Sequence, residues 1–170
     1  MKRFLCLLAF TVFLLSSCAE TDIKQQLSFP LAMRASLSPE GSEFYAEMDQ
    51  NGCTVSFESE RLKGISLYIS PNGNRVSVDG YFSRDVENGC FPAQELLCRA
   101  LLLLNTSEVN GEKSGNAVKY TIDETVIMVY YNEDTKEVTH IETEEKGRRF
   151  LFTVALLDSN EAQSNGAGRS

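Results

Sequence analysis

The sequence lacks the residues on which most metal and redox sites depend. His140 is the single histidine among 170 residues, and no second ligand or base can be paired with it. It lies in a polar alternating segment, so we expect an exposed strand residue. No two cysteines form a C-x-x-C pair, which leaves zinc binding and thioredoxin-type redox chemistry with little support. We therefore expect no metal and no cofactor.

The motifs of common enzyme active sites are also missing. The sequence contains no G-x-S-x-G, H-E-x-x-H or phosphate-binding loop motif. Residues 111–115 (Gly-Glu-Lys-Ser-Gly) lack the upstream glycine and the following apolar helix, so they are predicted to be a loop. Acidic residues cluster at 133–134 and 142–145, but carboxylates at turns are usually solvated. We expect a protein without catalytic residues that is not an enzyme.

Positive charge and long apolar runs are scarce as well. Lys and Arg total 16 against 24 Asp and Glu, which gives a net charge of −8. Nucleic-acid binding depends on Lys and Arg contacts to phosphates, so no nucleic-acid partner is expected. The main apolar run, from Phe4 to Leu15, is shorter than the ~20 residues that a membrane-spanning helix needs.

The N-terminal segment instead has the three parts of a secretory signal. Lys2 and Arg3 precede the apolar run, and the small residues Ser16 and Ser17 follow it. The end of the segment, Leu-Ser-Ser-Cys18, resembles the bacterial lipobox, in which the cysteine is acylated and becomes the new N-terminus. An ordinary signal with a chance cysteine is the alternative. The resemblance implies a lipoprotein signal peptide at 1–17 and lipidation at Cys18.

Such a lipidated chain would be extracytoplasmic and anchored to the bacterial plasma membrane. Loss of Lys2 and Arg3, the charged residues of segment 1–17, changes the formal charge from −8 to −10. An acidic domain is a poor partner for anionic lipid, so the acyl chains must supply the anchor, at ~0.8 kcal/mol per buried CH₂.

Three cysteines remain after Cys6 leaves with the signal and Cys18 is acylated. They are Cys53, Cys90 and Cys98. An odd number of cysteines outside the cell suggests a free thiol. Three small buried hydrophobic residues are the favoured interpretation, and one disulfide among the three stays an open alternative.

One segment of the exported part is predicted to be a helix, from Phe91 to Asn105. Pro92 suits the first helical position, because its missing N–H would have had no partner there. Glu95 and Arg99 lie side by side at i,i+4 spacing and suggest a single solvated stripe. The rest of the circumference is almost entirely apolar, so other elements must cover this helix on most sides.

The segments before and after this helix alternate between apolar and polar residues, which is typical of half-buried strands. Asn51-Gly52 is the strongest hairpin signal, and Pro30 argues for an edge or a bulge in the first strand. The expected strands are 26–37, 43–50, 53–58, 65–69, 75–82, 118–122, 125–131, 137–143 and 148–157. They predict an α+β fold: a curved antiparallel sheet (half-barrel) of about 8–9 strands covered by one main helix.

The predicted boundaries give one domain. Residues 18–25 would be a tether, residues 26–158 the folded domain, and residues 159–170 a disordered tail, because this last segment has almost no apolar side chain.

The strand and turn pattern resembles the lipoprotein-carrier-like half-barrels (the LolA/LolB superfamily) found among exported lipoproteins of Firmicutes. The similarity is carried by Cys53 to Phe82, with the Glu-Arg-Leu-Lys-Gly step at 60–64, and by Tyr120 to Val154. It extends over roughly Leu27 to Asp158. It is a pattern of strands and turns, and it contains no active-site signature.

The resemblance implies an apolar sheet face that holds an acyl chain or other apolar ligand, with the helix as a lid. The absence of tryptophan departs from the aromatic-rich cavities of the carriers, so a solid core is the alternative. The candidate ligand-binding residues are Phe44, Met48, Val55, Phe57, Ile69, Val78, Leu97, Leu101 and Leu104.

A second function follows from members of the same family that act as partner proteins. One supports a cortex amidase in spore germination. By this interpretation the chain is an interaction lipoprotein that holds or supports a cell-envelope enzyme, such as a peptidoglycan amidase. Tyr45, Tyr68 and Tyr81, which we expect to be exposed, favour it.

Overall fold

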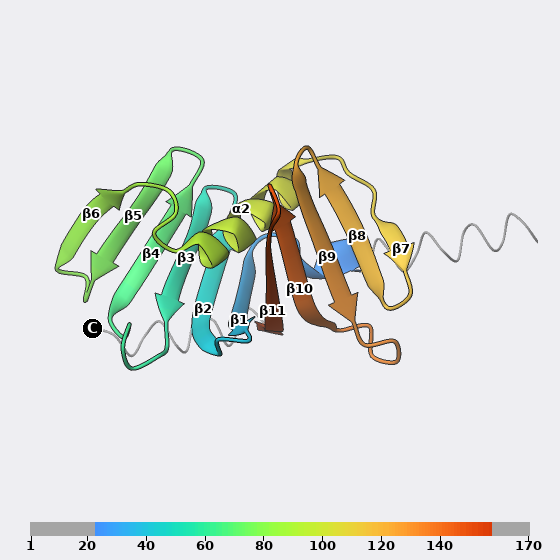
Figure 1. Ribbon diagram of the computed structural model, residues 1–170, viewed down its shortest axis with the longest axis horizontal. Helices are drawn as coiled ribbons and strands as arrows, with labels where there is room; N and C mark the ends of the chain where they lie inside the picture. The colour runs from blue at the N-terminus through green and yellow to red at the C-terminus, as the bar shows by residue number, and fades with distance from the viewer. Residues whose placement is uncertain (1–22, 158–170) are drawn as a thin grey trace, which may run out of the picture.

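The computed structural model describes residues 23–157 (Figure 1). The predicted signal peptide, the lipidation site Cys18, most of the tether and the C-terminal tail lie outside the described residues. The predictions for these segments therefore stay predictions.

The described residues form one open antiparallel sheet with the helix α2 (Pro92–Thr106) lying across one side of it (Figure 1). We call this the helix side and the opposite one the helix-free side. The strands are β1 (Leu31–Ser38), β2 (Ser42–Asp49), β3 (Gly52–Phe57), β4 (Ile65–Ser70), β5 (Gly73–Val78), β6 (Phe82–Val86), β7 (Glu112–Ser114), β8 (Ala117–Ile122), β9 (Thr125–Tyr131), β10 (Val138–Glu145) and β11 (Arg148–Leu157).

The first and last strands meet in the middle of the sheet. The strand order is β6-β5-β4-β3-β2-β1-β11-β10-β9-β8-β7, so the hairpins before and after α2 form two halves joined by the β1–β11 pair. Ala35, for example, lies opposite Phe44 on one neighbour and Val154 on the other. The helix contacts β3 and β4 in one half and β8, β9 and β10 in the other. It therefore spans the junction and covers the apolar face of both halves.

The predicted α+β class, the antiparallel sheet and the single main helix are confirmed, but the number of strands is wrong. The sheet has 11 strands rather than 8–9. The two additional strands are β6 and β7, which lie at opposite edges in segments predicted to be mainly loops. Most of their residues are exposed. A strand that is solvated on both sides carries no apolar alternation, so the sequence pattern could not reveal it.

The start of the domain also differs from the prediction. Residues 23–26 are helical and β1 begins only at Leu31, whereas a strand was expected from residue 26. Pro30 precedes β1 instead of interrupting it, and β1 is central rather than at an edge. Ile23 is buried, although residues 23–25 were assigned to the tether. The chain is thus packed against the domain five residues after Cys18.

Two polar side chains fasten this N-terminal segment to the end of α2. The Nζ of Lys24 donates hydrogen bonds to the carbonyls of Ser107 and Val109, both at 3.2 Å. A cation at this position also complements the negative end of the helix dipole. The amide of Asn105 donates to the Leu27 carbonyl at 2.8 Å.

Asn105 makes the larger number of hydrogen bonds, because its side-chain amide both donates and accepts. Its Oδ1 accepts the N–H of Phe29 at 3.2 Å, and its Nδ2 also donates to the Leu101 carbonyl at 2.9 Å. We expect Asn105→Ala to lower the free energy of unfolding by about 2 kcal/mol, because partly buried backbone groups lose their partners. Urea unfolding measures the loss. Asn116→Ala, at an exposed position, is the control, and equal effects of the two changes would contradict this assignment.

Candidate functional site

The predicted ligand-binding residues gather between α2 and the sheet, with one exception. Eight of them are buried in one continuous core: Phe44, Met48, Val55, Phe57, Ile69, Leu97, Leu101 and Leu104. Leu101, at the centre of the predicted crevice, is 0% exposed. The sequence pattern thus identified residues that do meet in space. They pack against one another between α2 and the sheet.

Val78 was wrongly placed in this interior. It lies on β5, beyond the reach of the helix, and is 39% exposed. Its register partners are Ile65 on β4 and Phe82 on β6. Val78 alternates with polar neighbours along the sequence, as an inward-facing strand residue does. However, β5 is not among the strands that α2 mainly contacts, so Val78 is left uncovered.

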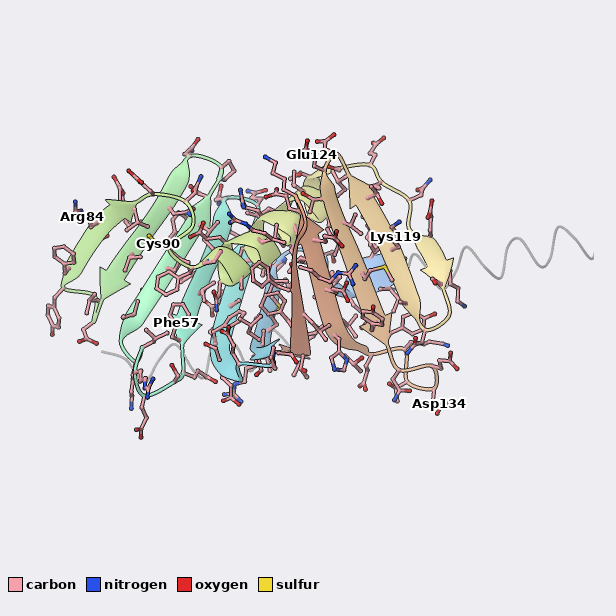
Figure 2. The ribbon with its side chains drawn as sticks, in the orientation of Figure 1. Phe57, Arg84, Cys90, Lys119, Glu124 and Asp134 are labelled. Carbon is pink, nitrogen blue, oxygen red and sulfur yellow. A yellow bond between two sulfur atoms is a disulfide. The ribbon has the colours of Figure 1, made fainter. Side chains whose placement is uncertain are left out.

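A disulfide holds α2 to the sheet. Cys53 on β3 and Cys98 on α2 are bonded, with their Cα atoms 6.1 Å apart. This overturns the favoured prediction of three buried free cysteines. Cys90, in the loop before the helix (Figure 2), is an exposed free thiol. The helix is therefore covalently fixed at its middle to the sheet that it covers.

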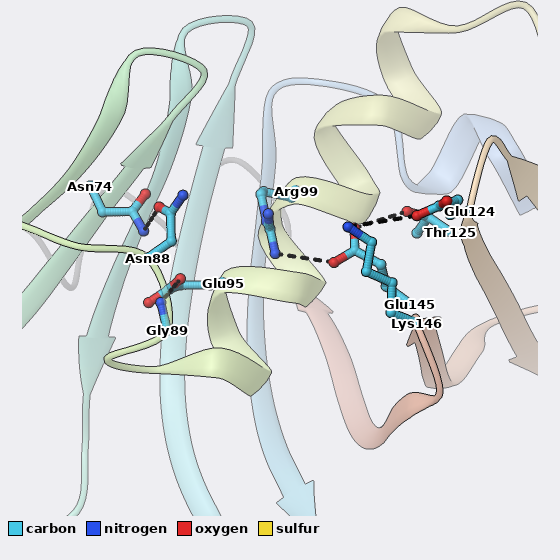
Figure 3. Close-up of polar contacts among 9 residues, drawn as sticks. All are labelled: Asn74, Asn88, Gly89, Glu95, Arg99, Glu124, Thr125, Glu145 and Lys146. Atoms are coloured by element: carbon cyan, nitrogen blue, oxygen red, sulfur yellow. Dashed lines mark hydrogen bonds and ion pairs between the residues drawn. The ribbon is translucent and has the colours of Figure 1, made fainter.

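Glu95 fixes the beginning of the helix, and it is not part of a solvated stripe as predicted. Its side chain is buried, with 2% exposure. One carboxylate oxygen accepts the N–H of Gly89 at 2.7 Å (Figure 3). The other accepts the N–H of Phe91 at 3.0 Å. These bonds satisfy backbone donors at the helix start. Arg99 alone stays at the surface, where it pairs with Glu145 at 3.6 Å (Figure 3).

The predicted crevice is thus filled by side chains and closed by a helix that is held at several points. Two surface hollows lie instead next to the β1–β11 pair. The first, of about 510 Å³, extends toward β2, and the second, of about 620 Å³, extends toward β10. Met48 lines the first of them, and the other eight candidate residues line neither.

Large apolar side chains are exposed at one edge of the sheet. Tyr81 is 97% exposed, Phe82 59% and Val78 39%. We call these three residues the edge patch; Arg84 lies beside it on β6 (Figure 2). At the opposite edge, the three residues of β7 are Glu, Lys and Ser. The two edges of the sheet are therefore chemically different.

The other two tyrosines that were expected to be exposed are not equivalent to Tyr81. Tyr45 is half-buried on β2 and donates its hydroxyl to Glu47 at 2.7 Å. Burial, with this hydrogen bond as the second cause, raises the pKa of Tyr45 to about 12, so the phenol stays protonated at neutral pH. Tyr68 is partly exposed on β4. Of the three, Tyr81 alone projects fully into solvent.

His140 and the acidic cluster at 142–145 are less solvated than the sequence predicts. His140 is half-buried rather than exposed, and its Nδ1 lies 3.1 Å from the hydroxyl of Thr139. Glu142 and Glu144 are paired with Arg149 at 3.1 and 3.0 Å, instead of being only solvated. The hydrogen bond to Glu144, followed by the charge of Glu142, raises the pKa of Arg149. Among residues 23–157, no three His, Cys, Asp or Glu side chains are placed to hold a metal ion.

No helix of the described part of the chain is long and apolar enough to cross a membrane.

No protein-family model matches the sequence, and no curated protein shows significant similarity to it.

Proposed function

We propose that this chain is a lipid-anchored, extracytoplasmic lipoprotein without enzymatic activity, which holds or supports a cell-envelope enzyme at the bacterial plasma membrane. A peptidoglycan amidase is the partner that the resemblance to the LolA/LolB-like lipoproteins suggests. The observation that carries the proposal is the edge patch: Tyr81, Phe82 and Val78 are exposed while the interior is packed.

An exposed aromatic edge is unusual for a protein that works alone. Sheets normally protect their edges with short strands and charged residues, because unpaired N–H and C=O groups attract other strands. β7 has this protection, with three polar residues. β6 has Phe82 at its first position and Tyr81 just before it. Aromatic residues are also the commonest anchors of protein interfaces. These features favour β6 as the surface that binds the partner.

The position of Ile23 is compatible with an anchor at Cys18. Five residues of extended chain reach at most ~18 Å, so lipidation at Cys18 would keep the buried Ile23, and with it the domain, close to the bilayer. An open antiparallel sheet with one helix across it is also compatible with the half-barrel that the sequence resembles.

Binding of an acyl chain between α2 and the sheet is the second candidate function. The apolar character of the eight buried candidates favours it. However, a chain could enter only if α2 moved, and the Cys53–Cys98 disulfide and the hydrogen bonds of Glu95 oppose that movement. Mass spectrometry of a solvent extract distinguishes the two functions, since a stoichiometric lipid beyond the acyl groups on Cys18 would favour the carrier.

The edge patch is tested with a photo-crosslinking amino acid at position 81 in living cells. We expect a reproducible adduct that contains a cell-wall hydrolase, and none from the same probe at Tyr45, which faces the helix-free side. The double variant Tyr81→Ser/Phe82→Ser should weaken the complex by at least ~30-fold, the effect of losing one strong aromatic anchor. Amidase activity in the membrane fraction should fall with it.

Identical adducts from positions 81 and 45, or unchanged hydrolase activity in the double variant, would refute the edge patch as the partner site. The anchor has its own control. Cys18→Ala should abolish incorporation of labelled fatty acid while leaving the patch intact, so a failure of anchoring and a failure of partner binding can be told apart.

A further inference from the structure

The hollow of about 510 Å³ lies on the helix-free side and is built from five adjacent strands. Residues directly opposite one another on antiparallel strands point to the same side of the sheet. The pairings Leu157–Ala32, Ala32–Glu47, Glu47–Thr54 and Thr54–Tyr68 therefore form one row across β11, β1, β2, β3 and β4. All five residues of this row line the hollow. We call it the cross-strand groove.

The sizes of the side chains explain why this row is hollow. Ala32 and Thr54 are short, Glu47 lies between them, and Leu157 and Tyr68 stand at the two ends of the row. Tyr68 lies close to the start of β3. A Cβ at Gly52 would lie 2.9 Å from the Tyr68 hydroxyl, so the absence of a side chain there lets the ring approach. The hydroxyl also donates a hydrogen bond to the Asn51 carbonyl at 3.4 Å.

The groove carries negative charge. Among residues 23–157, its lining includes Glu47 and Asp49 but no Lys, Arg or His. The N–H groups of Asn51 and Gly52 donate to the Asp49 carboxylate at 2.7 and 3.1 Å. The hydrogen bond from the backbone N–H of Asn51 is the main cause that lowers the pKa of Asp49.

The nearest arginines along the same strands are already paired elsewhere. Arg34, two residues beyond Ala32 on β1, lies 3.7 Å from Glu58. Arg75, the register partner of Tyr68, lies 3.0 Å from Asp85. Neither is among the residues that line the groove. A cation from outside is therefore the complement that the groove lacks.

We propose that the cross-strand groove binds a small organic amine with an aromatic or apolar body. The body would lie along the row between Leu157 and Tyr68, and the ammonium group would face Glu47 and Asp49. The volume of about 510 Å³ falls within the usual range of small-molecule sites. The ring of Tyr68 adds a surface that attracts cations. This site is separate from the edge patch and does not depend on lipidation.

Tryptamine is a suitable probe, because the protein contains no tryptophan and indole fluorescence therefore reports the ligand alone. The full chain is titrated in phosphatidylcholine vesicles, with empty vesicles as the blank. We expect saturable binding that weakens as salt screens the charges. Indole-3-propionate has the same ring but a carboxylate, and should bind at least ~10-fold more weakly, because like charges meet at the site.

Substitutions in the groove provide the second test. Glu47→Gln keeps the shape of the side chain and should weaken tryptamine binding by ~2–5-fold, the effect of losing one exposed charge pair. Ala32→Leu fills part of the groove and should weaken it further. Glu43→Gln is the matched control: Glu43 lies on the same side of β2 but does not line the groove, and its loss should leave affinity unchanged.

Three results would overturn the proposal. They are the absence of saturable tryptamine binding, equal affinities for tryptamine and indole-3-propionate, and equal affinities of the Glu47→Gln and Glu43→Gln variants. The last two comparisons do not depend on Ala32→Leu, so a folding defect in that variant would leave the test intact.

Discussion

Replacing both Cys53 and Cys98 by alanine is expected to lower the free energy of unfolding by about 4 kcal/mol, the largest effect among the changes considered. The disulfide joins residues 45 positions apart, and the loop-entropy relation gives roughly this value for a closed loop of that size. Both residues are fully buried, so their removal also costs packing. Urea unfolding of the oxidised protein and of the double variant measures the difference.

Cys90→Ala provides the matched control, because Cys90 is an exposed free thiol. Its removal should change the free energy of unfolding by less than ~0.5 kcal/mol, as is usual at the surface. Reduced wild-type protein should lose most of what the double variant loses. If the reductant shifts neither the urea midpoint nor the thiol reactivity of Cys53 and Cys98, the bond does not contribute to stability.

Leu101→Ala is expected to lower the free energy of unfolding by about 3–4 kcal/mol, within the range for leucines in well-packed cores. Leu101 is 0% exposed and belongs to the core between α2 and the sheet. The substitution leaves a cavity that a helix held by Cys98, Glu95 and Asn105 cannot close by moving inward. Urea unfolding again gives the value.

This substitution also discriminates between the two functions. If an acyl-chain cavity already lay beside Leu101, truncation would remove fewer contacts, and the loss would approach about 2 kcal/mol, near the transfer free energy of the three carbon atoms removed. Leu103→Ala, on the same helix but only half-buried, should cost about 1 kcal/mol. Equal losses at the two positions would contradict the packed interior and favour the carrier.

The helix and most of the strands could be predicted because their signals are local. Pro92 marks the first residue of α2, and the apolar surface around Leu97 and Leu101 requires burial on several sides. Alternating residues such as Phe44, Ala46 and Met48 identify the inward face of β2. Such patterns depend only on the period of the element, so they are readable within a few residues.

Glu95 and the edge strands show where local patterns fail. An i,i+4 pair with Arg99 indicates a solvated stripe, but Glu95 is buried because the loop before the helix turns its N–H groups toward the carboxylate. β6 and β7 are strands because each has a neighbour to pair with, β5 and β8 respectively. Their own residues carry no apolar alternation. In both cases a distant segment decides the structure.

The sequence by itself determined α2, nine of the eleven strands and, apart from Val78, the candidate core residues. The tertiary structure alone decided that this core is filled, that Cys53 pairs with Cys98, and that a groove crosses five strands. The physical reason is that packing, disulfide pairing and the groove depend on distances between segments as far apart as Ala32 and Leu157. Strand register and the crossing of α2 set those distances, and no short stretch of sequence encodes them.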